Sequence, residues 1–143
     1  MRKKLAMLVL TLLVICLTPM QIFALNQSQQ ESQQVISPRW TYITEFSNAF
    51  DISVTGLFQF NTSLSARSSI NKVEVNASIQ QYVNGNWQTI RSWTNTSTSS
   101  SIEVFREWYV VPGYYYRLVS TGAVYQDGVL MEQTSYTGPG YWY

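Results

Sequence analysis

Residues 71–93 read NKVEVNASIQQYVNGNWQTIRSW, and two features of this stretch decide the fold. In its first half, apolar residues alternate with polar ones, which is the period of a β-strand with one buried face. Asn84 and Gly85 then interrupt the alternation, and this dipeptide readily adopts the positive φ angles of a two-residue hairpin turn. The stretch therefore predicts two antiparallel strands joined by a tight turn.

A two-residue loop also predicts which residues oppose each other in this hairpin. The opposed pairs would be Tyr82 with Trp87, Ile79 with Ile90, and Asn76 with Trp93. This register puts the isoleucines on one face and the rings of Tyr82, Trp87 and Trp93 on the other. A bulged three-residue loop would shift the pairing by one residue and move both tryptophans to the face of Ile79. Asn-Gly favours the first register, so we expect an aromatic patch outside the main core.

The same alternation extends to both sides of this hairpin. The expected strands lie near 40–46, 50–60, 71–83, 87–94, 101–111, 114–125 and 129–137. Asp127 and Gly128 repeat the tight-turn signal, whereas the Ser/Thr-rich runs Ser63–Ser69 and Thr94–Ser101 are typical of loops. No window of helical length has an apolar stripe. About seven short strands with polar punctuation predict an all-β protein, an antiparallel β-sandwich.

A second informative stretch, residues 111–125, reads VPGYYYRLVSTGAVY. Three consecutive tyrosines in a strand point to alternating faces, so they cannot form one flat platform. Pro-Gly followed by Tyr116 and then Leu118 at the next same-face position resembles the E–F corner of fibronectin type III and immunoglobulin-like domains. The resemblance implies that the Tyr116 ring is buried and that its hydroxyl bonds to backbone near residues 108–111.

The N-terminal residues predict secretion. Basic residues at 2–4, an apolar run from Leu5 to about Leu17 and the small residue Ala24 are the layout of a signal peptide cleaved after Ala24. The apolar run is shorter than the roughly 20 residues of a membrane span. Residues 25–36 are rich in Gln and Ser, which predicts a disordered tether, and 37–143 would form the sandwich domain. We expect a secreted, extracellular protein without a covalent anchor or stable membrane insertion.

Several segments together resemble a known group of proteins. These are the leader, the Gln/Ser-rich segment, ISPRWTYI at 36–43, the 71–93 stretch and PGYYYRLVSTGAVY. They resemble a family of small secreted proteins of Gram-positive bacteria that is catalogued as a domain of unknown function. The resemblance implies localisation and class, and it supplies neither an activity nor site residues.

Much catalytic chemistry is missing from the chain. It has no histidine, and its single cysteine, Cys16, lies in the expected leader, so triads and imidazole or thiolate metal sites are excluded. Lys72 is interpreted as a solvated lysine in a polar loop. Glu103 and Glu107 share a strand face about 13 Å apart, whereas Glu45 and Asp51 flank an expected turn and could approach each other. A two-carboxylate hydrolase is therefore the one enzymatic alternative, and we expect no catalytic residue, metal or cofactor.

Charge and aromatic content point to a binding role. Without the leader, six basic and eight acidic residues remain, a net charge of −2 that disfavours nucleic acid and anionic membranes as partners. The chain has 5 Trp, 10 Tyr and 6 Phe, although β-propensity alone also recruits aromatic residues. The expected partner-binding residues are Tyr82, Trp87, Trp93, Tyr141, Trp142 and Tyr143. We expect a non-catalytic module that binds glycan, cell-wall polymer or protein; the alternative is a secreted bacteriocin-like antagonist.

Overall fold

The computed structural model describes residues 39–143, so the expected signal peptide, its cleavage at Ala24 and the tether at 25–36 lie outside the described residues. The strands are β1 (Ile43–Ile52), β2 (Leu57–Ala66), β3 (Lys72–Val83), β4 (Asn86–Ser97), β5 (Ser101–Tyr109), β6 (Tyr115–Gln126), β7 (Val129–Thr137) and β8 (Tyr141–Trp142). Over this range there is no helix long and apolar enough to cross a membrane.

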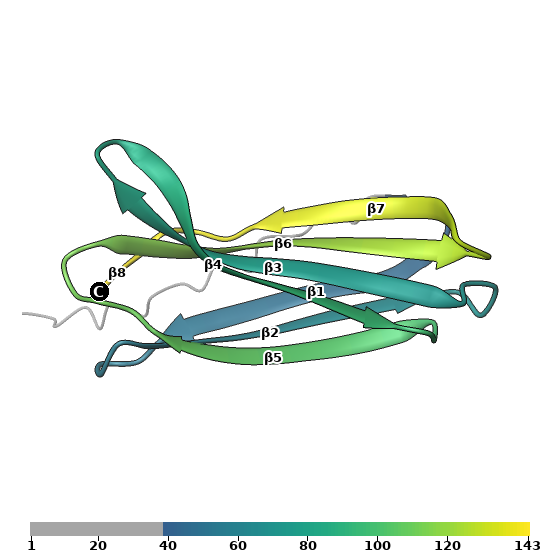
Figure 1. Cartoon of the computed structure of the whole chain (residues 1–143), viewed down its shortest axis with the longest axis horizontal. Helices are drawn as coiled ribbons and strands as arrows, with labels where there is room; N and C mark the ends of the chain where they lie inside the picture. The colour runs from purple at the N-terminus through teal and green to yellow at the C-terminus, as the bar shows by residue number, and fades with distance from the viewer. Residues whose placement is uncertain (1–38) are drawn as a thin grey trace, which may run out of the picture. The chain divides into compact units, whose positions relative to one another are not determined.

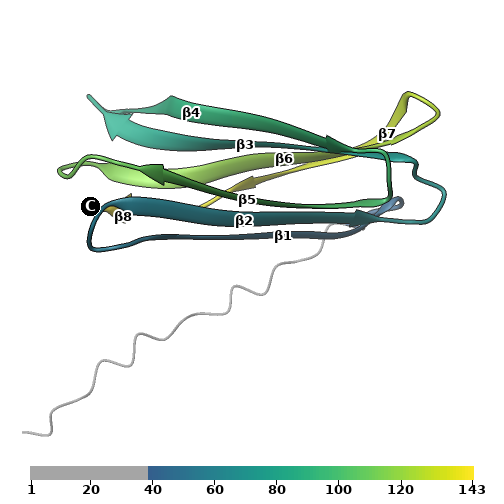
Figure 2. The same cartoon turned by 60° about the horizontal axis from the view of Figure 1, so that its bottom comes forward.

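The strands form two sheets that pack face to face. One sheet has the order β1-β2-β5 and the other the order β4-β3-β6-β7, with the short β8 paired to β6 (Figure 1). Seen from a second side, the two sheets lie as two layers along the same direction (Figure 2). Every strand pair is antiparallel. The prediction of an all-β antiparallel sandwich with seven main strands is confirmed.

The core lies between the inner faces of the two sheets. Strand alternation directs the odd-numbered residues of β3 and the even-numbered residues of β6 inward, and the fully buried side chains follow this rule. The largest of them are Tyr116, Phe58, Phe60, Leu64, Ile79 and Leu118. Each such apolar side chain contributes about 1.5–3 kcal/mol when it leaves water, so the two inner faces hold the sandwich together.

A small polar cluster connects the two layers inside this core. Asn48 of β1 accepts hydrogen bonds at Oδ1 from Thr62 Oγ1 at 2.9 Å and from Ser120 Oγ at 2.6 Å. Thr62 and Ser120 are buried, so these hydroxyls would be costly without an acceptor. Asn48 thus satisfies one hydroxyl from each sheet.

The boundaries expected for the first two strands are wrong. A turn at residues 53–56 separates β1 from β2, so the expected strand at 50–60 is divided between them. Gly56 adopts a φ of +81°, and its amide donates to the Ser53 carbonyl at 2.9 Å. Val54, which continues the apolar alternation in sequence, is 96% exposed at the turn. The apolar alternation continues in sequence across residues 53–56, so the pattern gave no sign of the turn.

Two Ser/Thr-rich runs expected as loops are largely strand. Residues 63–66 complete β2, residues 94–97 complete β4, and Ser101 begins β5. Lys72 is likewise the first residue of β3 and not part of a loop. Short hydroxyl-bearing side chains suit the outer faces of a sheet, where water and cross-strand partners satisfy them, and this explains why composition misled here.

The two predicted tight turns are confirmed, whereas the predicted register of the β3–β4 hairpin is confirmed only next to its turn. Asn84 and Asp127 have φ angles of 51° and 50°, as the tight hairpin turns require. Tyr82 opposes Trp87 as predicted. Ile90, however, is an extra residue in a β-bulge, so Ile79 opposes Arg91 instead of Ile90. Every later residue of β4 is shifted by one position, which reverses the face on which it lies.

Tyr116 occupies the position expected from its sequence context. Its ring is fully buried, and its hydroxyl donates to the Val111 carbonyl at 2.7 Å while accepting from Gln81 Nε2 at 3.0 Å. Burial raises the pKa of Tyr116, although these two hydrogen bonds act in the opposite direction. Tyr115 points to the other face and is 45% exposed, so the tyrosine run is divided between the two faces as predicted.

The carboxylate of Glu132 attaches the start of β1 to β7. Its two oxygens accept hydrogen bonds from the backbone N–H groups of Thr41, Tyr42 and Ile43 at 2.7–2.9 Å. Desolvation alone would raise the pKa of Glu132, but the three N–H donors and the nearby Arg67 outweigh it and hold this pKa below its ordinary value. No sequence pattern pointed to this contact.

Candidate functional site

Four aromatic side chains from four neighbouring strands lie at one level across the outer face of the β4-β3-β6-β7 sheet. We call them the aromatic row: Trp87 of β4, Tyr82 of β3, Tyr115 of β6 and Trp142 of β8. Trp87 opposes Tyr82, with ring centroids 5.1 Å apart, and Tyr115 opposes Trp142, with centroids 5.0 Å apart. The register of β3 with β6 ends at Gln81 and Tyr116, next to Tyr82 and Tyr115. Gly140 connects the two pairs, because a Cβ atom there would lie 3.0 Å from Trp87 and 3.8 Å from Tyr115.

The aromatic row is exposed but firmly supported. Trp142 is 62% exposed, Tyr115 45% and Tyr82 40%, values that leave ring faces open to a partner. Trp87 is less exposed because its ring packs against Gly140, where a Cβ atom would come within 3.0 Å of it. This glycine lets the chain before β8 pass directly over the indole. The row is therefore a set of preformed rings.

Arg117 lies in the next level of the same face. Its guanidinium carbon is 4.2 Å from the centroid of the Trp87 ring, a cation–π contact. Its Nε donates to Gln80 Oε1 at 2.9 Å, and the Gln80 amide donates in turn to Thr89 Oγ1 at 3.3 Å. These contacts hold the arginine in one orientation beside the aromatic row.

Small polar side chains cover the middle of this face. A shallow pocket of about 290 Å³ lies there, and the outward-facing side chains around it are Asn76, Ser78, Ser92, Thr94, Val119 and Thr121. They come from β3, β4 and β6, and Ser78 opposes both Ser92 and Val119. The face thus presents hydroxyl and amide groups next to the aromatic row.

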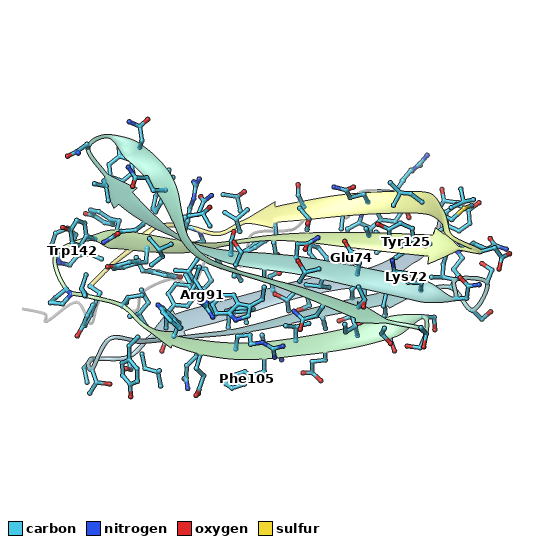
Figure 3. The ribbon with its side chains drawn as sticks, in the orientation of Figure 1. Lys72, Glu74, Arg91, Phe105, Tyr125 and Trp142 are labelled. Atoms are coloured by element: carbon cyan, nitrogen blue, oxygen red, sulfur yellow. The ribbon has the colours of Figure 1, made fainter. Side chains whose placement is uncertain are left out.

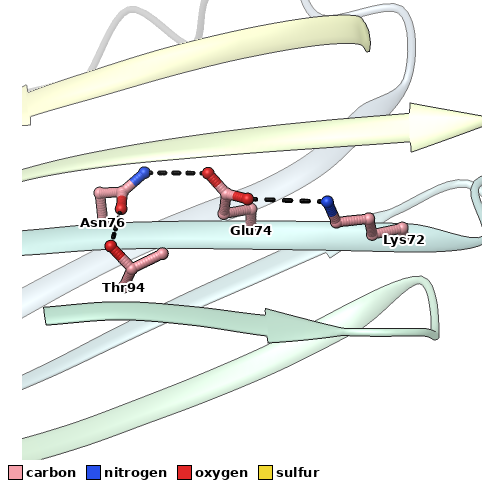
Figure 4. Close-up of polar contacts among 4 residues, drawn as sticks. All are labelled: Lys72, Glu74, Asn76 and Thr94. Carbon is pink, nitrogen blue, oxygen red and sulfur yellow. Dashed lines mark hydrogen bonds and ion pairs between the residues drawn. The ribbon is translucent and has the colours of Figure 1, made fainter. Parts of the chain in front are cut away.

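A chain of polar contacts occupies the far end of the same face. Lys72 Nζ lies 3.7 Å from Glu74 Oε2, Asn76 Nδ2 donates to Glu74 Oε1 at 3.2 Å, and Thr94 Oγ1 donates to Asn76 Oδ1 at 2.5 Å. Figure 4 shows these contacts as one continuous chain. Lys72 also lies 4.5 Å from the centroid of the Tyr125 ring. Lys72 and Trp142 mark opposite ends of the sheet in Figure 3. Glu74 is therefore already satisfied by its neighbours.

The outer face of the β1-β2-β5 sheet differs in charge and in aromatic content. Its carboxylates Glu103 and Glu107 accept hydrogen bonds from Asn61 and Gln59 of the adjacent strand. Phe105 lies between them in β5, is 54% exposed and points away from the sandwich in Figure 3. Tyr109, four residues along β5 on the same face, is 68% exposed, but neither ring is paired with another ring as in the aromatic row.

The expected approach of Glu45 and Asp51 does not occur. Both belong to β1 and oppose Ser65 and Gln59 of β2, so six residues of extended chain separate them. At about 3.3 Å per residue this is roughly 20 Å, because the turn expected between them lies after Ile52. Residues 39–143 contain no cluster of three or more His, Cys, Asp or Glu side chains suited to a metal ion.

The remaining expected binding residues lie mainly against the core. Trp93 opposes Ala77 and packs on Phe60 with centroids 5.4 Å apart, so its assignment to the outer patch is wrong. The Ile90 bulge is the cause. Tyr141 contacts the ring of Phe50 with centroids 5.1 Å apart and is 48% exposed, on the face opposite to Trp142. Tyr143 is half-buried against the core.

Three of the expected partner-binding residues, Tyr82, Trp87 and Trp142, belong to the aromatic row. Tyr115 and Arg117 were not among the expected binding residues. Both lie on β6, and their place beside Trp87 depends on pairings between segments far apart in sequence. Alternation assigned each of them to the outward face and could not show what lay beside it. No family model matches the sequence, and the curated proteins include none similar to it.

Proposed function

We propose that this protein is a non-catalytic binding module that holds a polysaccharide on the outer face of the β4-β3-β6-β7 sheet. The aromatic row is the observation that carries the proposal, because exposed and prearranged rings offer apolar ring faces at little entropic cost. The planes of the paired rings are inclined by 56° and 67°, so each exposed ring offers its own face, and the apolar C–H face of a sugar ring stacks on one such ring. The hydroxyl groups of the sugar remain at the edge and need hydrogen-bonding partners.

The polar middle of the face supports a glycan more than a protein partner. Ser78, Ser92 and Thr94 present hydroxyl groups beside the shallow pocket, and Gln80 and Thr89 connect this region to the aromatic row. A protein interface normally has an apolar centre with a polar rim. Here the rings lie at one end and hydroxyl-bearing side chains fill the middle, which suits an extended chain of sugars.

Three further expectations belong to this proposal. We propose that the chain is secreted after cleavage at Ala24, that it comes from a Gram-positive bacterium, and that its sandwich is of the fibronectin type III or immunoglobulin-like kind. The last is supported by the sheets β1-β2-β5 and β4-β3-β6-β7 and by the contact from Tyr116 to Val111 at the corner before β6. Secretion would bring the aromatic row into contact with cell-surface polymers.

The proposal is tested by measuring binding of the purified protein to defined polysaccharides. Soluble β-glucan, an N-acetylglucosamine polymer and polygalacturonate serve as probes in affinity electrophoresis or calorimetry. We expect Trp142→Ala to weaken binding to the preferred polymer about tenfold or more, the effect of losing about 1.4 kcal/mol. Phe105→Ala is the matched control, since it removes a similarly exposed ring from the opposite sheet.

Binding that is unchanged in Trp142→Ala, or reduced equally in Phe105→Ala, would remove the aromatic row from the function. Absence of binding to all three polymers by the unmodified protein would overturn the glycan assignment itself. Far-ultraviolet circular dichroism of both variants ensures that neither has lost its sheets.

A further inference from the structure

Arg117 is a cation held in place on the proposed binding face without a carboxylate partner. Its Nε is used by Gln80 and one face of its guanidinium covers Trp87. Among residues 39–143, no carboxylate lies within 4.0 Å of it, and its Nη1 and Nη2 atoms donate no hydrogen bond to protein. The two groups that remain are the ones that arginine uses for bidentate binding of a carboxylate or phosphate.

The distribution of charge also favours an anion at this position. Strands β4 and β6, which flank this part of β3, contain no acidic residue. Glu74, the acidic residue of β3, lies at the far end of the face and pairs with Lys72 at 3.7 Å. An anionic group beside the aromatic row would therefore meet Arg117 without repulsion from a neighbouring carboxylate.

The opposite sheet makes the contrast clear. Glu45, Asp51, Glu103 and Glu107 lie on β1 and β5 of the β1-β2-β5 sheet, and the strands of that sheet contain Arg106 as their only basic residue. Arg106 does not face outward with them, because it donates to Asn95 of β4 at the edge between the layers. A negatively charged ligand is thus repelled by one outer face and accepted by the other.

We propose that the polysaccharide bound by this face is anionic, and that Arg117 determines this specificity by binding its carboxylate or phosphate groups. The inference rests on the proposed function, because it assigns a charge to the ligand of the same site. A sugar residue stacks on the aromatic row while the anionic group of that residue or its neighbour lies against Nη1 and Nη2 of Arg117. Gln80 and Trp87 are positioning residues that orient the guanidinium.

The test compares three polymers and three variants of the full protein. The polymers are polygalacturonate, which carries carboxylates, phosphomannan, a polysaccharide that carries phosphodiesters, and a neutral β-glucan. Arg117→Gln removes the charge, Arg117→Lys keeps it without the planar fork, and Arg91→Gln is the matched control at the edge of the sandwich. Arg91 also stacks on an aromatic ring, with its guanidinium 4.5 Å from the Trp108 centroid.

We expect the unmodified protein to bind one of the anionic polymers about tenfold or more tightly than the neutral one, with an affinity that falls as salt rises. Arg117→Gln should reduce binding of the anionic polymer about tenfold or more, a larger factor than any loss for the neutral polymer, Arg117→Lys should lie between Arg117→Gln and the unmodified protein, and Arg91→Gln should have no effect. The polymer preferred identifies carboxylate or phosphate as the group bound.

Two results overturn the inference and leave the proposed function intact. The first is equal affinity of the unmodified protein for neutral and anionic polymers, with both lost in Trp142→Ala. The second is a loss of neutral and anionic binding to the same extent in Arg117→Gln, which would show that the arginine only supports Trp87. If the unmodified protein binds neither these polymers nor the N-acetylglucosamine polymer, the proposed function and this inference both fail. Unfolding curves of each variant separate loss of binding from loss of structure.

Discussion

Trp87 and Trp93 belong to the same strand, six residues apart, yet they have opposite roles. Trp87 is part of the aromatic row on the outer face and carries the guanidinium of Arg117. Trp93 lies between the sheets against Phe60. A regular strand would place both on one face, because side chains alternate with a period of two. The extra residue at Ile90 separates them, so a single bulge decides which tryptophan is core and which is available to a ligand.

Inserting one alanine between Ile90 and Arg91 is the most severe way to break this contrast. The insertion shifts the part of β4 beyond the bulge by one residue relative to β3, so Trp93 and the residues after it would turn to the opposite face. We expect a loss of more than about 4 kcal/mol in the free energy of unfolding, measured by urea denaturation. Ile90→Ala keeps the residue and should cost about 1 kcal/mol or less, since Ile90 is 39% exposed. Equal stability of the two variants would contradict the role of the bulge.

Alanine at each tryptophan sharpens the same contrast. Trp93→Ala leaves a cavity beside Phe60 and should cost about 3 kcal/mol, within the range for large aromatic residues in a core. Trp87→Ala should cost about 1 kcal/mol, mainly the contact with Arg117, and should abolish polysaccharide binding. Calorimetric melting and ligand titration of both variants check the two effects. A larger loss of stability in Trp87→Ala would reverse the assignment of the two residues.

Tyr115 and Tyr116 offer the same comparison between an exposed and a buried aromatic residue, here in consecutive positions of β6. Tyr116→Phe removes the donor to the Val111 carbonyl and should cost about 1–3 kcal/mol, which lowers the melting midpoint by several degrees. Tyr115→Phe changes only an exposed hydroxyl and should leave the midpoint nearly unchanged. Thermal denaturation measures the midpoints of both variants. Equal shifts would mean that the hydrogen bond to the Val111 carbonyl does not contribute to stability.

The smallest effect concerns carboxylates and depends on pH. Because the pKa of Glu132 is lowered in the folded state, the contribution of Glu132 is present above its ordinary value of about 4.3 and is lost as pH falls through the lower folded pKa. Glu132→Gln should therefore be less stable than the unmodified protein by about 1 kcal/mol at pH 7, and the difference should disappear in acid.

Glu103→Gln is the control for this prediction, since Glu103 lies on an exposed face and bonds to the side chain of Asn61. Its effect on stability should be close to zero at every pH, as for most exposed polar contacts. Unfolding in urea at pH 3, 5 and 7 measures both variants. A difference for Glu132→Gln that stays constant with pH would show that its charge is not what binds the N–H groups of residues 41–43.

Local chemistry alone predicted much of the fold. The period of two in residues 72–83 specified a strand, and Asn84-Gly85 and Asp127-Gly128 specified tight turns because few residues adopt their positive φ angles. The context of Tyr116 predicted a buried ring with a hydroxyl bonded to backbone, as observed. These features depend on residues close together in sequence, which is why they could be predicted.

The tertiary structure decided the rest. Nothing in the residues around Ile90 marks it as a bulge, because a bulge is favoured by the packing of the whole sheet and not by the residue itself. The aromatic row likewise combines Trp87, Tyr82, Tyr115 and Trp142 from four strands whose order follows from long-range pairing. Alternation assigns a residue to a face, but only the register between distant strands decides its neighbours, and a binding site is made of neighbours.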